Sequence, residues 1–508
     1  MRRRLDGGDG MLDDVHAWLV EYARRGDVES VLACIGALSD EYRQRGLDAV
    51  SAFAQCRSTP YAMYEALRNG HAQMVDVLLR HGAEVDAWGN TMNSGSTALM
   101  EAAERGHERT LHVLMAHGAR IDALDARGVS ALARAARSGH PGCVAALLQN
   151  GADPDVCTND GYTPLASAVY HGHLECVRVL LAYGASPHVT QFDGSTPLHT
   201  AAERGHLACL RMLLASGHLL DEQRNDGCSA LHCAVQEGLE DCAAVLLEHG
   251  AAFETRDAEG SSVLMAAAAY ASESTLRLLL ECGADAKDAD HTRFSALMCA
   301  AEYGKTKHLR ILLEHGADIN ACADQGSTAL LEAVWAGEDD CVGFLLKNGA
   351  NVNARMDEGF SALHLLVSSE LSIDCERRKC IAQLVIGHGL PIDCVDSAGE
   401  TALHRVAKLK SRKYFFCDGD DDSGEEDDVC DAASRSVSCV SKPLFEFLVL
   451  LGADPNSKSG SGEELTALQI FVHVHTDDAE EFLVLFASRL PNEQQSLLLG
   501  VNSSEGSQ

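Results

Sequence analysis

Leucine recurs at one fixed interval along more than half of the chain. Nine leucines follow one another at a spacing of 33 residues, without a shift: Leu99, Leu132, Leu165, Leu198, Leu231, Leu264, Leu297, Leu330 and Leu363. Apolar residues near each leucine keep helical spacing, since Ala201 and Ala202 lie three and four residues after Leu198 and share its face. A hydrophobic anchor at a constant interval indicates one structural unit stacked many times. Such a stack predicts a long binding surface rather than a single catalytic pocket.

Each unit is predicted to hold two short helices separated by a glycine. In one unit Gly205 ends the first helix, because glycine adopts the left-handed cap conformation without a steric penalty. Leu210, Leu213 and Leu214 then form the apolar stripe of a second helix, which Gly217 ends. The Asp-Gly or Asn-Gly pairs that follow favour a tight turn with positive φ. We therefore expect a hairpin finger to project from the stack after each helix pair.

The units resemble a known repeat family. The clearest copy runs from Ser195 to His206 and reads Ser-Thr-Pro-Leu-His-Thr-Ala-Ala-Glu-Arg-Gly-His, and Thr163–His173 and Ser96–His107 are similar. This pattern is similar to the ankyrin repeat, which has a period of 33 and the signature T-P-L-H-x-A. The resemblance covers residues 58 to 490. It implies an all-α repeat solenoid of about twelve helix-turn-helix units with projecting β-hairpin fingers.

The resemblance divides the chain into parts with different expected roles. In order, these are an N-terminal helical cap over 1–57, ankyrin repeats over 58–408 with regular units from about 95 to 371, a disordered insertion over 409–441, the last repeats and a C-terminal cap over 442–490, and a flexible tail over 491–508. End units must differ from the others because each end of a stack meets water. Arg24, Arg25 and Glu29 are accordingly expected on the polar outer face of the N-terminal cap.

Two insertions interrupt the period. Leu363 and Leu403 are 40 residues apart, so we expect seven extra residues near 372–379 to lengthen the loop between two helices. The spacing between Leu403 and its partner Leu448 is about thirty residues longer than in the other units. The inserted residues are first basic and then strongly acidic, which predicts disorder. Within them, Ser423 precedes a run of acidic residues and resembles the sites of acid-directed kinases. We hypothesise that Ser423 is phosphorylated; the alternative is a solvated insertion without a regulatory role.

The net charge of −34 restricts the partners of this chain. So acidic a surface repels phosphate backbones and anionic membranes, which argues against nucleic acid and favours a protein partner with a basic surface. No apolar run reaches the length of a membrane span, and the arginines at positions 2–4 lack the apolar core of a secretory signal. Cys143, Cys176, Cys209 and Cys242 are 33 residues apart, which predicts small buried side chains in a reducing compartment. The cytoplasm is the expected location, with the nucleus as the alternative.

Catalytic and metal-binding motifs do not emerge from the sequence. Most of the 23 histidines fall on repeat positions, two of which hold four histidines each, and the family resemblance implies that these eight make local hydrogen bonds to the backbone. The sequence contains no C-x-x-C pair, glycine-rich phosphate loop, G-x-S-x-G or H-E-x-x-H motif. We therefore expect no enzyme activity, no cofactor and no metal.

The resemblance places partner binding in a concave groove, lined by the finger tips and the exposed ends of the first helices. The five positions are the two residues before the finger glycine, the residue after it, and the two residues after the Ala-Ala pair, which gives 45 sites in nine units. Because 5% of all residues are aromatic, chance would place two or three aromatics at these sites. Eight occur there: Tyr162, Tyr170, Phe192, Tyr270, Phe294, Tyr303, Trp335 and Phe360. Trp88, in a lengthened turn, is a ninth candidate. Binding hot spots are enriched in Trp and Tyr, whereas the alternative is that these rings only stiffen neighbouring fingers.

These observations predict a monomeric scaffold or adaptor that binds another protein along its groove. Two other functions stay open: a substrate-recognition subunit of a ubiquitin ligase, and an inhibitor or assembly chaperone that masks a partner's site. A ligase subunit of the common type would carry a Leu-Cys-Arg motif near its C-terminus, and the last residues here contain no cysteine. A repeat-containing enzyme would need a separate catalytic domain, and no segment is long enough for one.

Overall fold

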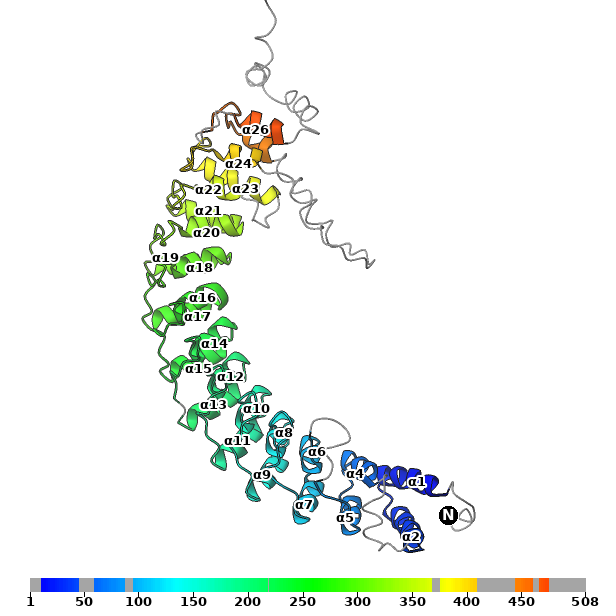
Figure 1. The fold of residues 1–508 in the computed structure, drawn as a ribbon. Helices are drawn as coiled ribbons and strands as arrows, with labels where there is room; N and C mark the ends of the chain where they lie inside the picture. The colour runs from blue at the N-terminus through cyan, green and yellow to red at the C-terminus, as the bar shows by residue number, and fades with distance from the viewer. Residues whose placement is uncertain are drawn as a thin grey trace, which may run out of the picture. The chain divides into compact units, whose positions relative to one another are not determined.

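The computed structural model describes residues 11–44, 59–86, 95–217, 219–367, 375–408, 444–459 and 466–474. These residues form short helices joined by turns (Figure 1). Contacts between residues divide the chain into two large parts, Met1–Ala258 and Glu259–Gln508. Each part holds several repeats, and we call them the first and the second unit. Among the helices of the described ranges, none combines the length and the apolar character that crossing a bilayer requires.

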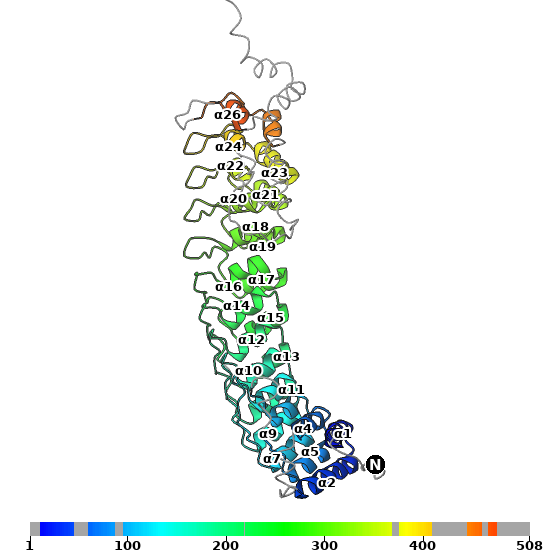
Figure 2. The ribbon, with the colours of Figure 1, turned by 45° about the vertical axis from the view of Figure 1, so that its right-hand side comes forward.

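The helices of the first unit come in pairs. They are α1 (Met11–Arg25), α2 (Val28–Gln44), α4 (Thr59–Arg68), α5 (Ala72–Arg80), α6 (Ala98–Glu104), α7 (Glu108–Ala116), α8 (Ala131–Arg137), α9 (Pro141–Gln149), α10 (Pro164–Tyr170), α11 (Leu174–Ala182), α12 (Pro197–Glu203), α13 (Leu207–Ala215), α14 (Ala230–Gln236) and α15 (Glu240–Glu248). From α4 on, the even-numbered member of each pair is the first helix of a repeat. Consecutive first helices pack side by side, and the second helices form a neighbouring row (Figure 2).

The second unit continues the same alternation. Its helices are α16 (Val263–Tyr270), α17 (Glu273–Glu281), α18 (Ala296–Glu302), α19 (Thr306–Glu314), α20 (Ala329–Ala336), α21 (Asp339–Lys347), α22 (Ala362–Leu366), α23 (Cys375–Gly387), α24 (Ala402–Lys408), a helix over 444–450 and α26 (Ala467–Val474). Here too, α16, α18, α20, α22 and α24 are first helices that contact one another in sequence.

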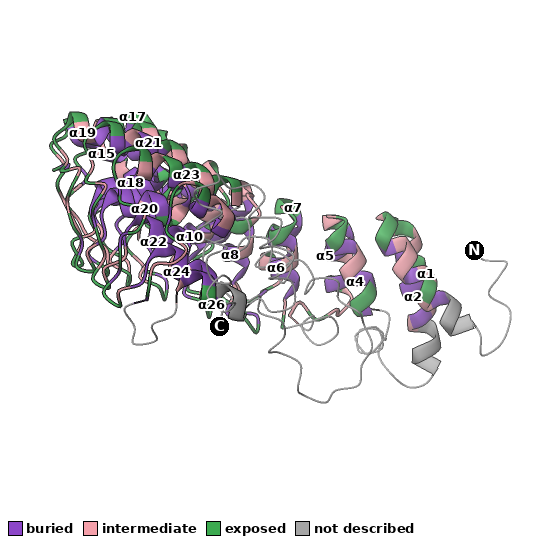
Figure 3. Ribbon diagram, turned by 90° about the horizontal axis from the view of Figure 1, so that it is seen from above, coloured by how far each residue is buried: buried purple, intermediate pink, exposed green. Residues whose placement is uncertain are grey.

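The core lies between the two rows of helices in each unit. In α12, Leu198, Ala201 and Ala202 are buried, as the helical spacing predicts. From α13, Leu213 is buried beside them, whereas Leu214 is half-buried at the edge of the stripe. Small alanines allow adjacent helices to approach closely. Figure 3 shows the result: the first helices are largely buried, and the second helices expose one side.

Glycine and histidine connect most successive repeats of the first unit, whereas Leu239 takes the place of the histidine opposite Gly205. Gly172 has a φ of 72°, which favours glycine, and a Cβ added there would lie 2.7 Å from Cε1 of His206 in the following repeat. His206 fills this notch and its Nε2 donates to the carbonyl oxygen of Tyr170 at 3.1 Å. The same bond recurs at His140 and His173, to the carbonyls of Glu104 and Arg137. These histidines therefore form the backbone hydrogen bonds that the family resemblance implies.

The fingers are tight turns with little strand character. At one finger, Thr158 N donates to Tyr162 O at 3.0 Å and Gly161 N donates to Thr158 O at 2.9 Å. Asn159 N then donates to Arg127 O of the preceding finger at 2.9 Å, which ties the two tips together. Among the described residues, strand pairing is limited to isolated bridges such as the one between Gln223 and Ser229. The expected β-hairpins thus exist as hydrogen-bonded turns rather than as extended ladders.

The first insertion differs from its prediction. Residues 375–379 were expected in a lengthened loop, yet they begin α23, which has 13 residues where the preceding second helix, α21, has nine. The preceding helix α22 is short, and Arg378 donates from Nη1 to the carbonyl oxygen of Leu366 at its end, at 2.6 Å. The buried Arg378 side chain thereby satisfies a helix terminus that would otherwise lack a partner.

Some predictions concern residues outside the described ranges. These include Trp88, the acidic insertion with Ser423, and the tail over 491–508. Helices α1 and α2 fall within the predicted N-terminal cap, and Arg24, Arg25 and Glu29 are exposed there. That this pair acts as a cap stays a prediction, as does the count of about twelve repeats.

Candidate functional site

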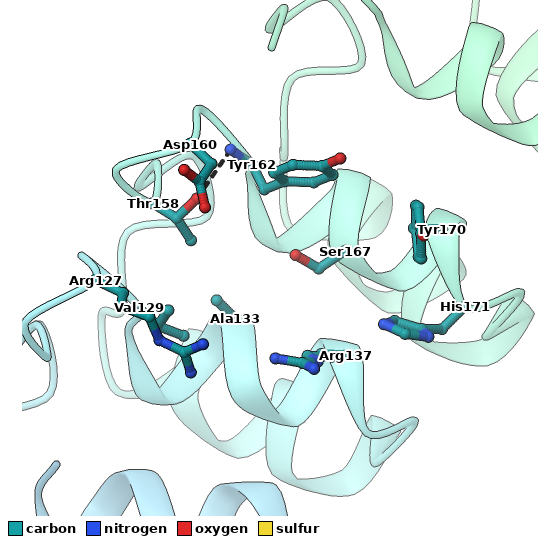
Figure 4. A pocket seen from close by; sticks show the side chains of 10 residues that line it. All are labelled: Arg127, Val129, Ala133, Arg137, Thr158, Asp160, Tyr162, Ser167, Tyr170 and His171. Atoms are coloured by element: carbon teal, nitrogen blue, oxygen red, sulfur yellow. Dashed lines mark hydrogen bonds between the residues drawn. The ribbon is translucent and has the colours of Figure 1, made fainter. Parts of the chain in front are cut away.

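The first helices and the fingers share one face of each unit, and a cleft opens on this face in the first unit. It lies between α8 and α10 and has a volume of about 420 Å³. Arg127 and Arg137 line it from the α8 side, and Tyr162, Tyr170 and His171 line it from the α10 side (Figure 4). The cleft therefore brings together two of the predicted aromatic residues and two arginines.

The two tyrosines of this cleft support each other. Tyr162 precedes the cap of α10 and Tyr170 ends the helix, and their rings meet edge to face at 6.3 Å with an angle of 86°. Arg204 from the next repeat lies over the Tyr170 ring at 4.1 Å and donates from Nη2 to its hydroxyl group. Burial raises the pKa of Tyr162, with a smaller contribution from Tyr170. Both rings stay half-exposed, so they are held in place while still open to a ligand.

The arginines of α8 and its finger divide into two kinds. Arg134 is largely buried and donates to Glu104 and to the fully buried carboxylate of Asp125, at 2.7 Å and 2.8 Å. Burial alone would raise the pKa of Asp125, but the N–H of Val129 and the guanidinium of Arg134 outweigh it and lower that pKa. Arg127 and Arg137 are exposed, and neither guanidinium has an ion pair or hydrogen bond within the part of the chain that the structure describes. Their charges are therefore available to a ligand.

His171 adds a third polar group to this wall. Burial lowers the pKa of His171, and the positive charge of Arg137 lowers it further. The imidazole is consequently neutral near pH 7 and can donate or accept a hydrogen bond. His171 also lies next to the Tyr170 ring, with centroids 5.1 Å apart.

In the second unit, Tyr270 and Tyr303 form a comparable aromatic pair. Their hydroxyl oxygens are 2.6 Å apart, and their rings meet edge to face at 4.9 Å. The hydrogen bond to Tyr270 and burial raise the pKa of Tyr303 to about 12. Both side chains remain exposed, at 46% for Tyr270 and 43% for Tyr303. Two exposed rings fixed in one geometry form a rigid anchor on the first-helix face.

A second cleft, of about 780 Å³, lies farther along the second unit. Trp335 and Phe360 line it together with the carboxylates of Asp357 and Glu358. Arg405 also lines it, with its guanidinium 3.9 Å from the Phe360 centroid, but its charge is engaged by the buried Asp396 at 2.9 Å. The unengaged charges of this cleft are therefore negative.

Phe192 and Phe294 line neither of these two clefts. Phe192 is 75% exposed at a finger tip, where its carbonyl oxygen accepts a hydrogen bond from Asn225 Nδ2 at 2.9 Å. Phe294 is half-buried and follows Arg293 in the finger before α18. Trp88 lies outside the described residues. The structure thus brings Tyr162 and Tyr170 together, Tyr270 and Tyr303 together, and Trp335 and Phe360 together.

Sequence reasoning expected Arg204 in a polar rim around the aromatics but missed the two arginines that line the first cleft. Arg137 follows the Ala135-Ala136 pair, so it occupies one of the five positions that were counted, but that count considered aromatic residues only. A count of charged residues at the same positions would have found Arg137. Arg127 lies one residue before the finger glycine and would have been found in the same way.

Other polar groups of the described chain have structural roles. His364 is buried, its Nδ1 lies 2.8 Å from Ser361 Oγ, and its Nε2 donates to the carbonyl oxygen of Glu400 at 2.9 Å. Cys143 and Cys176 are free and buried, and burial raises the pKa of each thiol to about 11. Within the described residues, no group of His, Cys, Asp and Glu is arranged to hold a metal ion.

Comparison with protein families agrees with the geometry. A family model described as ankyrin repeats (3 copies) matches residues 22–125, 114–191, 183–257 and 263–356. These matches cover more than half of the chain, and the first of them begins inside the segment predicted as the N-terminal cap. Comparison with curated proteins found no match. Ankyrin repeats are generally protein-interaction modules and are typically non-catalytic. With its 33-residue helix pairs, finger turns and matching family model, this chain belongs to the ankyrin-repeat family.

Proposed function

We propose that this chain is a non-enzymatic scaffold or adaptor that binds partner proteins along the face formed by its first helices and fingers. The observation that carries the proposal is the set of three aromatic pairs on that face, whose rings are exposed or half-exposed. In the first two pairs the rings also contact each other, which fixes their positions. Water-exposed aromatic rings contribute little to folding, but at an interface they supply large contact areas with few rotamers to restrict. Prearranged rings reduce the ordering cost of binding.

The second cleft supports a partner with a basic surface. Trp335 is 39% exposed, and the carboxylates of Asp357 and Glu358 border the same cleft as its indole ring. A lysine or arginine side chain can place its cation over an aromatic face and beside these carboxylates. The net charge of −34 also attracts basic surfaces over longer distances.

Photo-crosslinking tests this proposal. A benzophenone amino acid replaces Tyr170, Tyr303 or Trp335 in cells, and Tyr183 serves as the matched control. Tyr183 is an aromatic residue of similar exposure, 44%, at the end of the second helix α11. We expect the three first-helix positions to crosslink to a common partner and position 183 not to do so. Equal crosslinking from position 183, or none from the three other positions, would contradict the proposal.

The stoichiometry of the complex separates the forms of this function. Native mass spectrometry of the chain with its crosslinked partners should show two different partners bound at once if the chain is a scaffold. A single partner whose own binding site is covered would instead indicate an inhibitor or assembly chaperone. We place the protein in the cytoplasm as a monomer; the free, buried cysteines of the described residues suit a reducing compartment.

A further inference from the structure

The cleft between α8 and α10 carries a positive charge in a strongly acidic chain. Asp and Glu number 75 in the sequence, against 41 Lys and Arg, so a free arginine has many potential partners. Arg105 pairs with Glu101 at 2.6 Å, and Arg224 pairs with Asp226 at 2.7 Å. Arg127 and Arg137 differ, since within the described part of the chain their guanidinium groups have no such partner although both line one cleft.

The opposite wall of the cleft supplies neutral hydrogen-bond donors and an aromatic surface. Tyr162, Ser167 and Thr158 line it, and Figure 4 shows their side chains facing the space above the two arginines. The hydroxyl group of Thr158 accepts a hydrogen bond from Tyr162 N at 3.1 Å and keeps its own proton to donate. A ligand between these walls meets two guanidinium groups on one side and hydroxyl groups with tyrosine rings on the other.

We propose that this cleft binds a phosphorylated side chain of a partner protein. This inference rests on the proposed function, because the phosphorylated residue belongs to a partner segment on the first-helix face. Arginine binds phosphate through paired N–H donors, and a phosphate monoester carries about −1.5 to −2 charges and three acceptor oxygens at pH 7. A carboxylate has two oxygens, which one guanidinium satisfies. Two separate guanidinium groups and several hydroxyl groups therefore match the phosphate ester better.

Asp160 provides an internal test of this assignment. It is exposed at the finger tip and is the only carboxylate among the residues that line the described cleft. Its negative charge opposes an anionic ligand and would favour a cationic one. Removal of this charge must therefore change affinity in opposite directions for the two kinds of occupant.

The test uses the full chain and oriented peptide libraries with a fixed central residue. Fluorescence polarisation compares phosphoserine and phosphotyrosine libraries with matched libraries that carry Ser, Tyr or Glu. We expect at least one of the phosphorylated libraries to bind. The library that binds more tightly identifies the partner residue as phosphoserine or phosphotyrosine. Arg137→Gln and Arg127→Gln should each weaken binding about tenfold or more, since hydrogen bonds between charged groups are lost. Asp160→Asn should strengthen binding.

Arg109→Gln is the matched control. Arg109 is an exposed arginine on the second helix α7, so this variant loses the same charge away from the cleft. Circular dichroism confirms that each variant is folded. The inference is overturned if Glu peptides bind as tightly as phosphopeptides, if Arg109→Gln weakens binding as much as Arg137→Gln, or if Asp160→Asn weakens it. It is also overturned if a single-stranded oligonucleotide binds this cleft and phosphopeptides do not. Crosslinking from Trp335 that persists in any of these cases would leave the proposed function standing.

Discussion

The clefts of the two units have the same arrangement of helices and turns, but their unengaged charges have opposite signs. In the first unit, Arg127 and Arg137 are unengaged and face Tyr162 and Tyr170. In the second unit, Asp357 and Glu358 border Trp335 and Phe360. Since the framework is common to both, the few exposed positions around it decide which ligand each cleft can accept. Under the two proposals above, one architecture would recognise two chemically different groups.

Two arginines at equivalent positions, one in each unit, do not contribute to the difference in charge between the two clefts. Arg134 and Arg405 each come two residues after a repeat leucine, and each donates to a fully buried aspartate nine residues earlier, Asp125 and Asp396. These arginines hold a finger against its helix in both units. Arg137, three residues farther along α8, has no such role, and this position can vary between repeats without loss of the fold.

The largest expected effect tests whether the two frameworks are equivalent. Leu165 in α10 and Leu330 in α20 are both buried repeat leucines beneath these faces. Replacement of either by alanine should destabilise its unit by about 2–5 kcal/mol, because a cavity remains in a packed core. Hydrogen exchange should increase most in the mutated repeat and its neighbours, since each repeat contacts only adjacent ones. If only one of the two variants lost stability, the two frameworks would not be equivalent.

An intermediate effect concerns the contribution of a buried histidine of the second unit, His364, to the pH dependence of stability. Burial lowers the pKa of His364, which stacks against Phe360 at 6.2 Å, although the bond to the Glu400 carbonyl acts in the opposite direction. Because the folded pKa is lowered, the stability from the neutral imidazole is complete above its unfolded pKa near 6.5 and is lost as the pH falls through the folded value. Thermal unfolding of the intact chain should therefore shift downward between pH 7.5 and 5.5.

His364→Gln should reduce this pH dependence. His112→Gln, at an exposed position on α7, is the control and should leave the slope unchanged. An unaltered slope in His364→Gln would contradict the assignment of this pH dependence to the buried histidine.

The smallest effect concerns a finger of the second unit. Arg293 has a φ of 61° where the equivalent residue of other fingers is glycine, and this conformation costs a non-glycine residue about 1–2 kcal/mol. Its exposed ion pair with Asp324, at 2.6 Å, returns only about 0–1 kcal/mol. Arg293→Gly should therefore stabilise the unit slightly in urea unfolding, by about 0.5 kcal/mol. Arg293→Ala keeps the strain, loses the ion pair and should destabilise it; equal effects of the two variants would contradict this account.

Sequence periodicity predicts the repeated parts of this molecule well and the irregular parts poorly. The leucine at position 198 and the glycine at 205 define a helix and its end through local preferences, which the structure confirms. The extension of α23 depends instead on Arg378, whose side chain reaches the end of α22 across a change of direction. No local pattern records that contact, so the sequence alone suggested a loop.

The candidate sites show the same division. The pair of Tyr270 and Tyr303 follows from the repeat register, because the two residues are 33 apart and equivalent positions in neighbouring repeats lie side by side. Which arginine is engaged does not follow from the register, since Arg134 and Arg137 lie on the same short helix, yet Arg134 is largely buried beside a carboxylate and Arg137 is exposed. That distinction requires the finger of Asp125 to be placed in three dimensions.

The glycine notch and the histidine that fills it have a consequence for how such a chain can change in length. His173 and His206 each bond backward to the preceding repeat, and Gly172, which directly precedes His173, receives the ring of His206. A segment that is one repeat long therefore contains one histidine that donates, one backbone carbonyl that accepts, and one glycine that leaves room for the next histidine ring. Among the repeats joined by a glycine and a histidine, recombination that duplicates or deletes such a segment leaves the new junction matched, so the array can gain or lose whole repeats.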